Sequence, residues 1–137
     1  MIQLEADDRV LLRQNGWRLA DSHAFTVTLY RDYIRASRGE FTVAKDANVR
    51  LSTGWFSDRS ACYLACGRPV ITQDTGFNAV LPTGEGLFAF RTLEDILNAF
   101  EAINADYEKH SRAAQAIAEE YFKAETVLAQ LLKDLGF

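Results

Sequence analysis

Two short polar segments carry the side chains whose types and spacing could do chemistry. The first, Ser-Asp-Arg-Ser, precedes an apolar helical pattern and so stands where a helix amino terminus is expected. Free backbone N–H groups, two hydroxyls and a guanidinium at such a terminus suit phosphate binding. The second, Asp-Thr-Gly, follows a predicted strand, and its glycine lets a ligand approach the backbone closely. The residues are Ser57, Asp58, Arg59 and Ser60 in the first segment, and Asp74, Thr75 and Gly76 in the second.

One helix and one strand must position these two segments. The helix is predicted from apolar Ala61, Leu64 and Ala65 on one side, and it ends at Gly67. A β-branched run at residues 70–71 then predicts a buried strand. In a parallel α/β sheet the carboxyl ends of strands and the amino ends of helices meet at one edge. We therefore expect both segments at the same rim, with Arg59 pointing along the helix axis.

The remaining elements follow from hydrophobic periodicity and turn residues. Strands and helices alternate and are then followed by helices only, which predicts an α/β fold with a doubly wound parallel sheet. We expect one domain over residues 1–137, with a helical tail at about residues 92–137. Residues 46–57 show no period, and a stretch of that length is typical of a functional loop. Helical patterns cover residues 7–14, 28–38, 92–103, 106–122 and 125–135, and strand patterns cover 17–20, 41–45 and 87–90.

Apolar residues at helical spacing mark the faces that we expect to be buried. The tail also has a capping-box pattern, in which Thr92 is followed three residues later by Asp95. The expected inward residues are Val10 and Leu11; Leu29, Tyr30, Tyr33 and Ile34; Leu93, Ile96, Leu97, Phe100 and Ile103; and Val127, Leu128, Leu131, Leu132 and Leu135.

Composition excludes several classes of partner. The chain has 137 residues, 48% of them hydrophobic, which suffices for one packed core. A net charge of -4 and a pI near 5.1 offer no general attraction to nucleic acid or anionic lipid. No apolar run approaches the ~20 residues of a membrane span, and the amino terminus is acidic where a signal peptide is basic. We expect a cytoplasmic protein without a membrane span.

Several residues near the two segments have both a functional and a structural interpretation. Lys45 reaches the rim or is an exposed residue at a strand end. Trp55 stacks on a base, or together with Phe56 covers the core. Phe77 adds a weak sugar contact, or the loop at residues 74–77 is a plain turn. In the functional interpretation residues 57–60 bind phosphate. In the structural interpretation Ser57 only caps the helix, and Asp58 and Arg59 are solvent-exposed charges in its first turn.

Histidine and cysteine usage argues against a metal site. His23 and His110 lie far apart in the chain, so each is expected at the surface or on a helix, with a general-base role as the minor alternative. Cys62 and Cys66 share a helix face but have no second pair or nearby histidine. Two buried, reduced thiols are the expected state, and no metal is expected.

One sequence motif resembles a known family. It is Ala-Cys-Gly-Arg-Pro-Val at residues 65–70, and it is followed by Pro-Thr-Gly-Glu-Gly and a helical tail. It is similar to the carboxy-terminal, donor-binding domain of GT-B-fold glycosyltransferases of the group 1 type, over roughly residues 33–137. Gly76 and Gly86 fall where the family's later glycines belong. The resemblance implies the Rossmann-like half of a GT-B fold, binding a nucleotide-diphosphate sugar without a metal or cofactor.

Two departures from the family shape the functional expectation. Gly54 and Cys62 stand where many retaining members carry glutamates. The family's acceptor domain and its first donor-domain strands have no counterpart here, so we expect a fragment that is inactive alone and associates with the acceptor domain or with a second copy through the helical tail. The alternatives are a non-catalytic nucleotide-binding or regulatory module and a protein-interaction module.

Overall fold

The computed structural model describes residues 6–19 and 26–136, which divide between two compact units. The units are Met1–Tyr30 and Arg31–Phe137, so the second nearly coincides with the span of the family resemblance. In the first unit, helix α1 (Ala6–Gln14) confirms the predicted helix at residues 7–14 but contains no buried residue. The expected strand at residues 17–20 is wrong for residues 17–19, which form no strand, and Ala20 lies outside the described residues.

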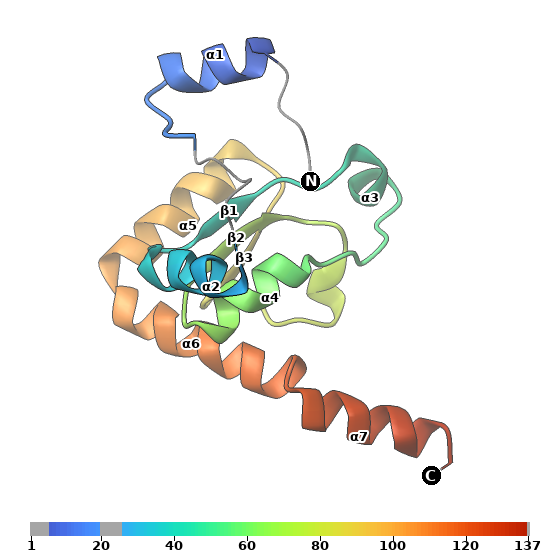
Figure 1. Ribbon diagram of the computed structural model, residues 1–137. Coiled ribbons are helices and arrows are strands. Elements are labelled where there is room, and N and C mark those ends of the chain that lie inside the picture. The colour runs from blue at the N-terminus through green and yellow to red at the C-terminus, as the bar shows by residue number, and fades with distance from the viewer. Residues whose placement is uncertain (1–5, 20–25, 137) are drawn as a thin grey trace. The chain divides into compact units, whose positions relative to one another are not determined.

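A parallel sheet forms the centre of the second unit (Figure 1). Its three strands lie in the order β1-β2-β3, with Phe41 paired to Ile71 and Ile71 paired to Phe88. This confirms an α/β fold with a parallel sheet and the three strands expected there. The strands are β1 (Glu40–Thr42), β2 (Val70–Gln73) and β3 (Leu87–Phe90).

Helices α4 (Asp58–Ala65) and α5 (Leu93–Ala105) pack on opposite faces of the sheet. Arg59 of α4 contacts Glu40 and Thr42 of β1, whereas α5 packs against Ile71. Ile71 pairs with Phe41, which lies between Glu40 and Thr42, and successive strand residues point to opposite faces. The remaining elements are α2 (Val27–Ala36), α3 (Asp46–Arg50), the 3-10 turn η2 (Phe77–Ala79), α6 (Tyr107–Tyr121) and α7 (Ala124–Asp134).

Local signals set the helix boundaries near the sheet. Gly67 has a φ of 64° directly after α4, which confirms it as the predicted stop. The Thr92 hydroxyl accepts the Asp95 N–H at 3.2 Å, and the Asp95 carboxylate accepts the Thr92 N–H at 2.9 Å, so the predicted capping box is present. The stretch at residues 46–57 is not wholly irregular, because it begins with the short helix α3.

The core lies between the sheet and α5, with a second layer between α4 and α6. Ile71, Phe90, Ala99 and Ile103 form one buried cluster, with Phe88, Ile96 and Tyr107 packed against it. His110 of α6 is buried, and its Nδ1 accepts the Gly86 N–H at 3.2 Å. His110 therefore lies on a helix, which is one of the two expected positions, and it is buried rather than at the surface, while His23 lies outside the described residues.

Many apolar residues at helical spacing are exposed, contrary to expectation. Ile34 and Ile103 are buried as expected, but the other predicted inward positions of α1, α2 and α5 are mostly exposed, and so is Ala65 of α4. The five large apolar residues expected to face inward at residues 127–135, in the last helix and at its C-cap, are 48–64% exposed. The exposed residues that we expected to be buried are Val10, Leu11, Leu29, Tyr33, Leu93, Leu97, Phe100, Val127, Leu128, Leu131, Leu132 and Leu135.

Within the described residues, no helix combines the length and the apolar character that crossing a membrane takes.

Candidate functional site

A cavity of about 320 Å³ lies at the carboxyl ends of β2 and β3. Helix α3 and the loop that follows it also line this cavity. The cavity lies at the edge of the sheet where the sequence places the rim. Ligands of open α/β sheets bind outside the carboxyl ends of the strands. The cavity is lined by Val49, Ser52, Gln73, Asp74, Gly76, Phe90 and Arg91.

A buried carboxylate organises this cavity. The side chain of Asp74 is 3% exposed, and its Oδ1 accepts the Gly76 N–H at 2.7 Å. Its Oδ2 accepts the Asn78 side-chain amide at 3.0 Å and the Nε of Arg91 at 2.8 Å, while the Nη2 of Arg91 lies 2.7 Å from the same oxygen. Asp74 thus holds the β2–η2 loop closed and fixes the guanidinium of Arg91.

A glycine and a serine with an unusual backbone conformation form another part of the cavity wall. Gly76 has a φ of 91°, and a Cβ there would lie 3.2 Å from the carbonyl oxygen of Ser52. Ser52 has a φ of 46°, and it is the one non-glycine residue with a positive φ within the described ranges. Left-handed conformations of non-glycine residues cost energy and cluster at functional sites. The close approach of the two loops therefore places a strained backbone at the cavity wall.

The polar groups left over at the cavity are hydrogen-bond donors. Gln73 uses its Oε1 to accept the Ala44 N–H at 3.2 Å, which leaves its Nε2 uncommitted. Across residues 6–19 and 26–136, the Nη1 of Arg91 and the hydroxyl of Ser52 also have no hydrogen-bond partner. Val49 and Phe90 supply the apolar part of the lining. The cavity can accordingly receive a ligand that has both acceptor oxygens and an apolar or planar part.

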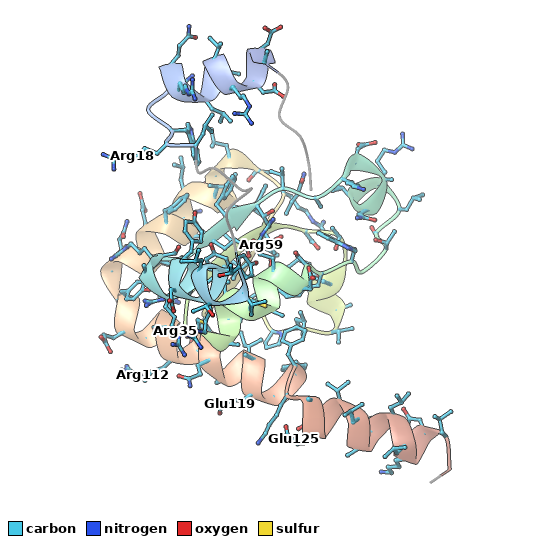
Figure 2. All side chains as sticks on the ribbon, in the orientation of Figure 1. Arg18, Arg35, Arg59, Arg112, Glu119 and Glu125 are labelled. Atoms are coloured by element: carbon cyan, nitrogen blue, oxygen red, sulfur yellow. The ribbon has the colours of Figure 1, made fainter. Side chains whose placement is uncertain are left out.

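Arg59 lies against the sheet instead of pointing along the axis of α4 (Figure 2). Its Nε donates to Oε1 of Glu40 at 2.5 Å, and its Nη2 donates to the Thr42 hydroxyl at 2.8 Å. The side chain of Glu40 is 5% exposed, and its Oε2 has no partner in the part of the chain that the structure describes. The charge of Arg59 is thus already compensated, which corrects the orientation expected from the sequence.

The other residues of the segment at 57–60 divide between interior and surface. Ser57 precedes α4 as its N-cap but makes no side-chain cap hydrogen bond, and it is buried. Ser60 is completely buried, and its hydroxyl has no hydrogen-bond partner among the described residues. Asp58 is exposed, and its Oδ1 accepts the Arg59 N–H at 2.9 Å. The two serine hydroxyls therefore do not lie at the surface of the rim.

The second rim loop is largely internal as well. Thr75 is buried, and its hydroxyl donates to the carbonyl oxygen of Trp55 at 2.6 Å. Phe77 is 2% exposed and packs against Phe56 at 5.2 Å between ring centroids, so the structure places it in the core and not at the rim surface. Trp55 remains exposed, as does Lys45, which is the N-cap of α3.

The structure thus brings Asp74 and Gly76 together in the cavity and adds three polar residues that the sequence did not single out. Arg91 follows the end of a strand, as Asp74 does, and this position is the signal that could have found it. Gln73 is the last residue of β2, where the same reasoning applies. Nothing in the sequence marks Ser52, because a positive φ at a serine has no local signature.

The cysteines are free, and they are less buried than expected. Cys62 is exposed and Cys66 is half-buried, which corrects the expectation of two buried thiols. Partial burial raises the pKa of the Cys62 thiol, and the nearby charge of Asp58 raises it further. A raised thiol pKa lowers the thiolate fraction at neutral pH and disfavours nucleophilic or redox chemistry. Across the described ranges, no three His, Cys, Asp or Glu residues group so that they could hold a metal ion.

Comparisons with protein-family models, with curated proteins and with solved structures find no match for this chain. Function is therefore inferred from the motif at residues 65–70 and from the geometry of the rim cavity.

Proposed function

We propose that this chain is the donor-binding domain of a GT-B-type glycosyltransferase, and that it binds a nucleotide-diphosphate sugar at the carboxyl edge of its sheet. The observation that carries the proposal is the cavity of about 320 Å³ at the carboxyl ends of β2 and β3. This is the position at which open α/β sheets bind nucleotides. The motif at residues 65–70 supports the same assignment, because it spans the end of α4 and the start of β2 as the family resemblance requires.

The chemistry expected of such a site is neutralisation of a departing diphosphate. A nucleotide diphosphate leaves with negative charge on its phosphate oxygens, and fixed donors and cations stabilise that charge without a metal. Arg91, Gln73 and Ser52 are the donors that line the cavity. The exposed Asp58, Lys45 and Trp55 lie on segments next to the rim and remain candidates for contacts with the rest of the donor.

Glycosyl transfer itself needs a second domain in this proposal. In a GT-B enzyme the acceptor binds across a cleft from the donor, so one wall binds the donor without transferring the sugar. The doubly wound sheet of such a domain also has more strands than the three described here. The chain alone is therefore proposed to bind a nucleotide sugar and to show no turnover.

Titration with UDP, GDP and TDP, followed by amide chemical shifts, tests this function. We expect shifts for the amides of Ser52, Gln73 and Arg91, which line the cavity. The amides of Gly67 and Glu85 serve as internal controls, because they lie before β2 and β3, at the opposite edge of the sheet. Absence of shifts with all three nucleotides, or equal shifts at both edges, would contradict the proposal.

A second candidate function, protein association, is favoured by the last helix. Figure 1 shows α7 continuing beyond α6 and away from the sheet. It buries none of its residues, and its apolar residues form an exposed stripe. Exposed apolar stripes of this kind mark interaction surfaces. Its first turn carries Glu125 and its last turn Lys133, so two antiparallel copies would bring opposite charges together, whereas parallel copies would oppose like charges.

We expect the isolated chain to form dimers through α7. Light scattering at high concentration should show a dimer, and Leu131→Glu should convert it to a monomer by placing a charge in the stripe. The control is Val80→Glu, because Val80 is also an exposed apolar residue but lies after η2. A wild-type chain that stays monomeric, or a dimer that Leu131→Glu leaves intact, would rule out association through this helix.

A further inference from the structure

We propose that Arg91 binds the phosphate groups of the ligand in the rim cavity, and that Asp74 is the positioning residue that holds it there. The inference rests on the proposed function for the identity of the whole ligand. Its phosphate chemistry follows from the residues of the cavity alone and can be tested without a nucleotide.

The geometry of the ion pair separates an anchor from a free end. The carboxylate of Asp74 is 3% exposed, whereas the side chain of Arg91 is 76% exposed. Two nitrogens of the guanidinium, Nε and Nη2, contact the same Asp74 oxygen at 2.8 and 2.7 Å. These contacts fix the plane of the guanidinium and leave the Nη1 side uncommitted. A guanidinium held in one orientation loses little freedom when it binds a second anion.

The uncommitted side-chain nitrogens at the charged end of the cavity are hydrogen-bond donors. Both oxygens of Asp74 are engaged, one by Gly76 and the other by Asn78 and Arg91. The acceptor atom of Gln73 is engaged by the Ala44 N–H. What remains for a ligand are the Nη1 of Arg91, the Nε2 of Gln73 and the hydroxyl of Ser52, all of which can donate, so a ligand that supplies acceptor oxygens fits this end of the cavity. Phosphate oxygens meet this requirement, and Arg binds them with charge-assisted hydrogen bonds.

Neither of the two arginines on neighbouring helices fills this role. Arg59 contacts Glu40 and Thr42 of β1, and Arg50 pairs with Asp46 of its own helix at 3.4 Å, so these partners lie outside the cavity lining, whereas the partner of Arg91 belongs to it. Neither residue lines the cavity, and within the described residues Arg91 is the cation that does.

The amino terminus of α5 lies next to Arg91 but does not offer the anion site. The capping box occupies the Asp95 N–H, and the Asp95 carboxylate accepts the N–H groups of Arg91 and Thr92 at 2.9 Å each, so a carboxylate already lies at this terminus. Hydrogen bonds from these two backbone groups lower the pKa of Asp95, which favours the charged carboxylate at this terminus and disfavours a second anion there. A phosphate is therefore expected at the guanidinium and not at the helix terminus.

The test uses inorganic pyrophosphate as the probe and isothermal titration calorimetry as the readout. Wild-type chain should bind pyrophosphate, and Arg91→Gln should weaken that binding about tenfold to a hundredfold, as expected for the loss of charge-assisted hydrogen bonds. Arg91→Lys keeps a positive charge beside Asp74 and should give an intermediate loss, because a lysine cannot contact two oxygens in a fork. The control is Arg112→Gln, since Arg112 has a similar exposure of 72% but lies on α6.

Titrations with UDP and with uridine distinguish the role of Arg91 from the proposed function of the whole site. UDP should lose affinity on Arg91→Gln by the same factor as pyrophosphate, while uridine, which has no phosphate, should bind both proteins equally. Pyrophosphate binding that depends on Arg91 without any nucleotide binding would support this inference and overturn the proposed function. Absence of pyrophosphate binding by the wild-type chain, or an unchanged affinity in folded Arg91→Gln and Arg91→Lys, would overturn the inference.

Discussion

Replacing Arg59 with alanine should destabilise the folded state by about 2–4 kcal/mol, because it leaves a buried carboxylate without its cation. The side chain of Glu40 is 5% exposed, and the contact at 2.5 Å from Arg59 to its Oε1 is its charged interaction. The other oxygen has no partner within the described residues. The expected loss of stability is smaller than for a fully buried ion pair, because the side chain of Arg59 is about half exposed. Urea denaturation of the two proteins measures the difference.

Two further variants identify the cause of the loss. Arg50→Ala removes an arginine whose partner Asp46 is exposed, and such surface pairs contribute about 0–1 kcal/mol. Glu40→Gln combined with Arg59→Ala removes the buried charge together with its partner and should recover part of the lost stability. A loss for Arg59→Ala no larger than that for Arg50→Ala would show that the ion pair with Glu40 does not stabilise the fold.

The sequence predicts well the features that depend on neighbouring residues. The β-branched run after Pro69 becomes β2, and Gly67 ends α4 because a left-handed conformation is needed there. Thr92 and Asp95 form their capping box because the two groups that bond lie within one helical turn. The carboxyl edge of the sheet follows from the same local pattern, since each strand is followed by a polar loop.

Pairings across the fold decided the details of the site, and the sequence does not reveal them. Arg59 lies 19 residues from Glu40, and a first-turn arginine has no local reason to turn toward a strand. Arg91 lies 17 residues from Asp74, and only the parallel register of β2 and β3 brings their ends together. The strained Ser52 likewise results from the close approach of two loops.

The exposed apolar faces show why periodicity alone misled the prediction of burial. Leu97 lies at helical spacing within α5 and Leu128 within α7, yet both are exposed. Periodicity indicates which face of a helix is apolar, but burial requires a partner for that face. For α7 no such partner lies within the described residues, and the proposed dimer would supply one.

Gly86→Ala should destabilise the fold more than alanine at any other glycine of the chain, because the added Cβ makes the shortest contact there. Gly86 has a φ of 74°, and a Cβ there would lie 2.3 Å from the backbone nitrogen of Ala114 in α6. The backbone of a helix cannot give way as the end of a flexible side chain can, so α6 must move away from the start of β3. Overpacking and the left-handed conformation together should cost about 2–4 kcal/mol. The shift would also stretch the hydrogen bond from the Gly86 N–H to His110.

Gly84→Ala is the matched control, because it separates backbone strain from the clash. Gly84 has a φ of 103° in the same turn, but a Cβ there would meet no atom within 4 Å. This variant should therefore show only the cost of a left-handed alanine, about 1–2 kcal/mol. Thermal and urea denaturation of both variants gives the difference that belongs to the contact with α6. Equal losses for Gly84→Ala and Gly86→Ala would mean that α6 is not packed against the turn before β3, and the buried position of His110 would have to be revised with it.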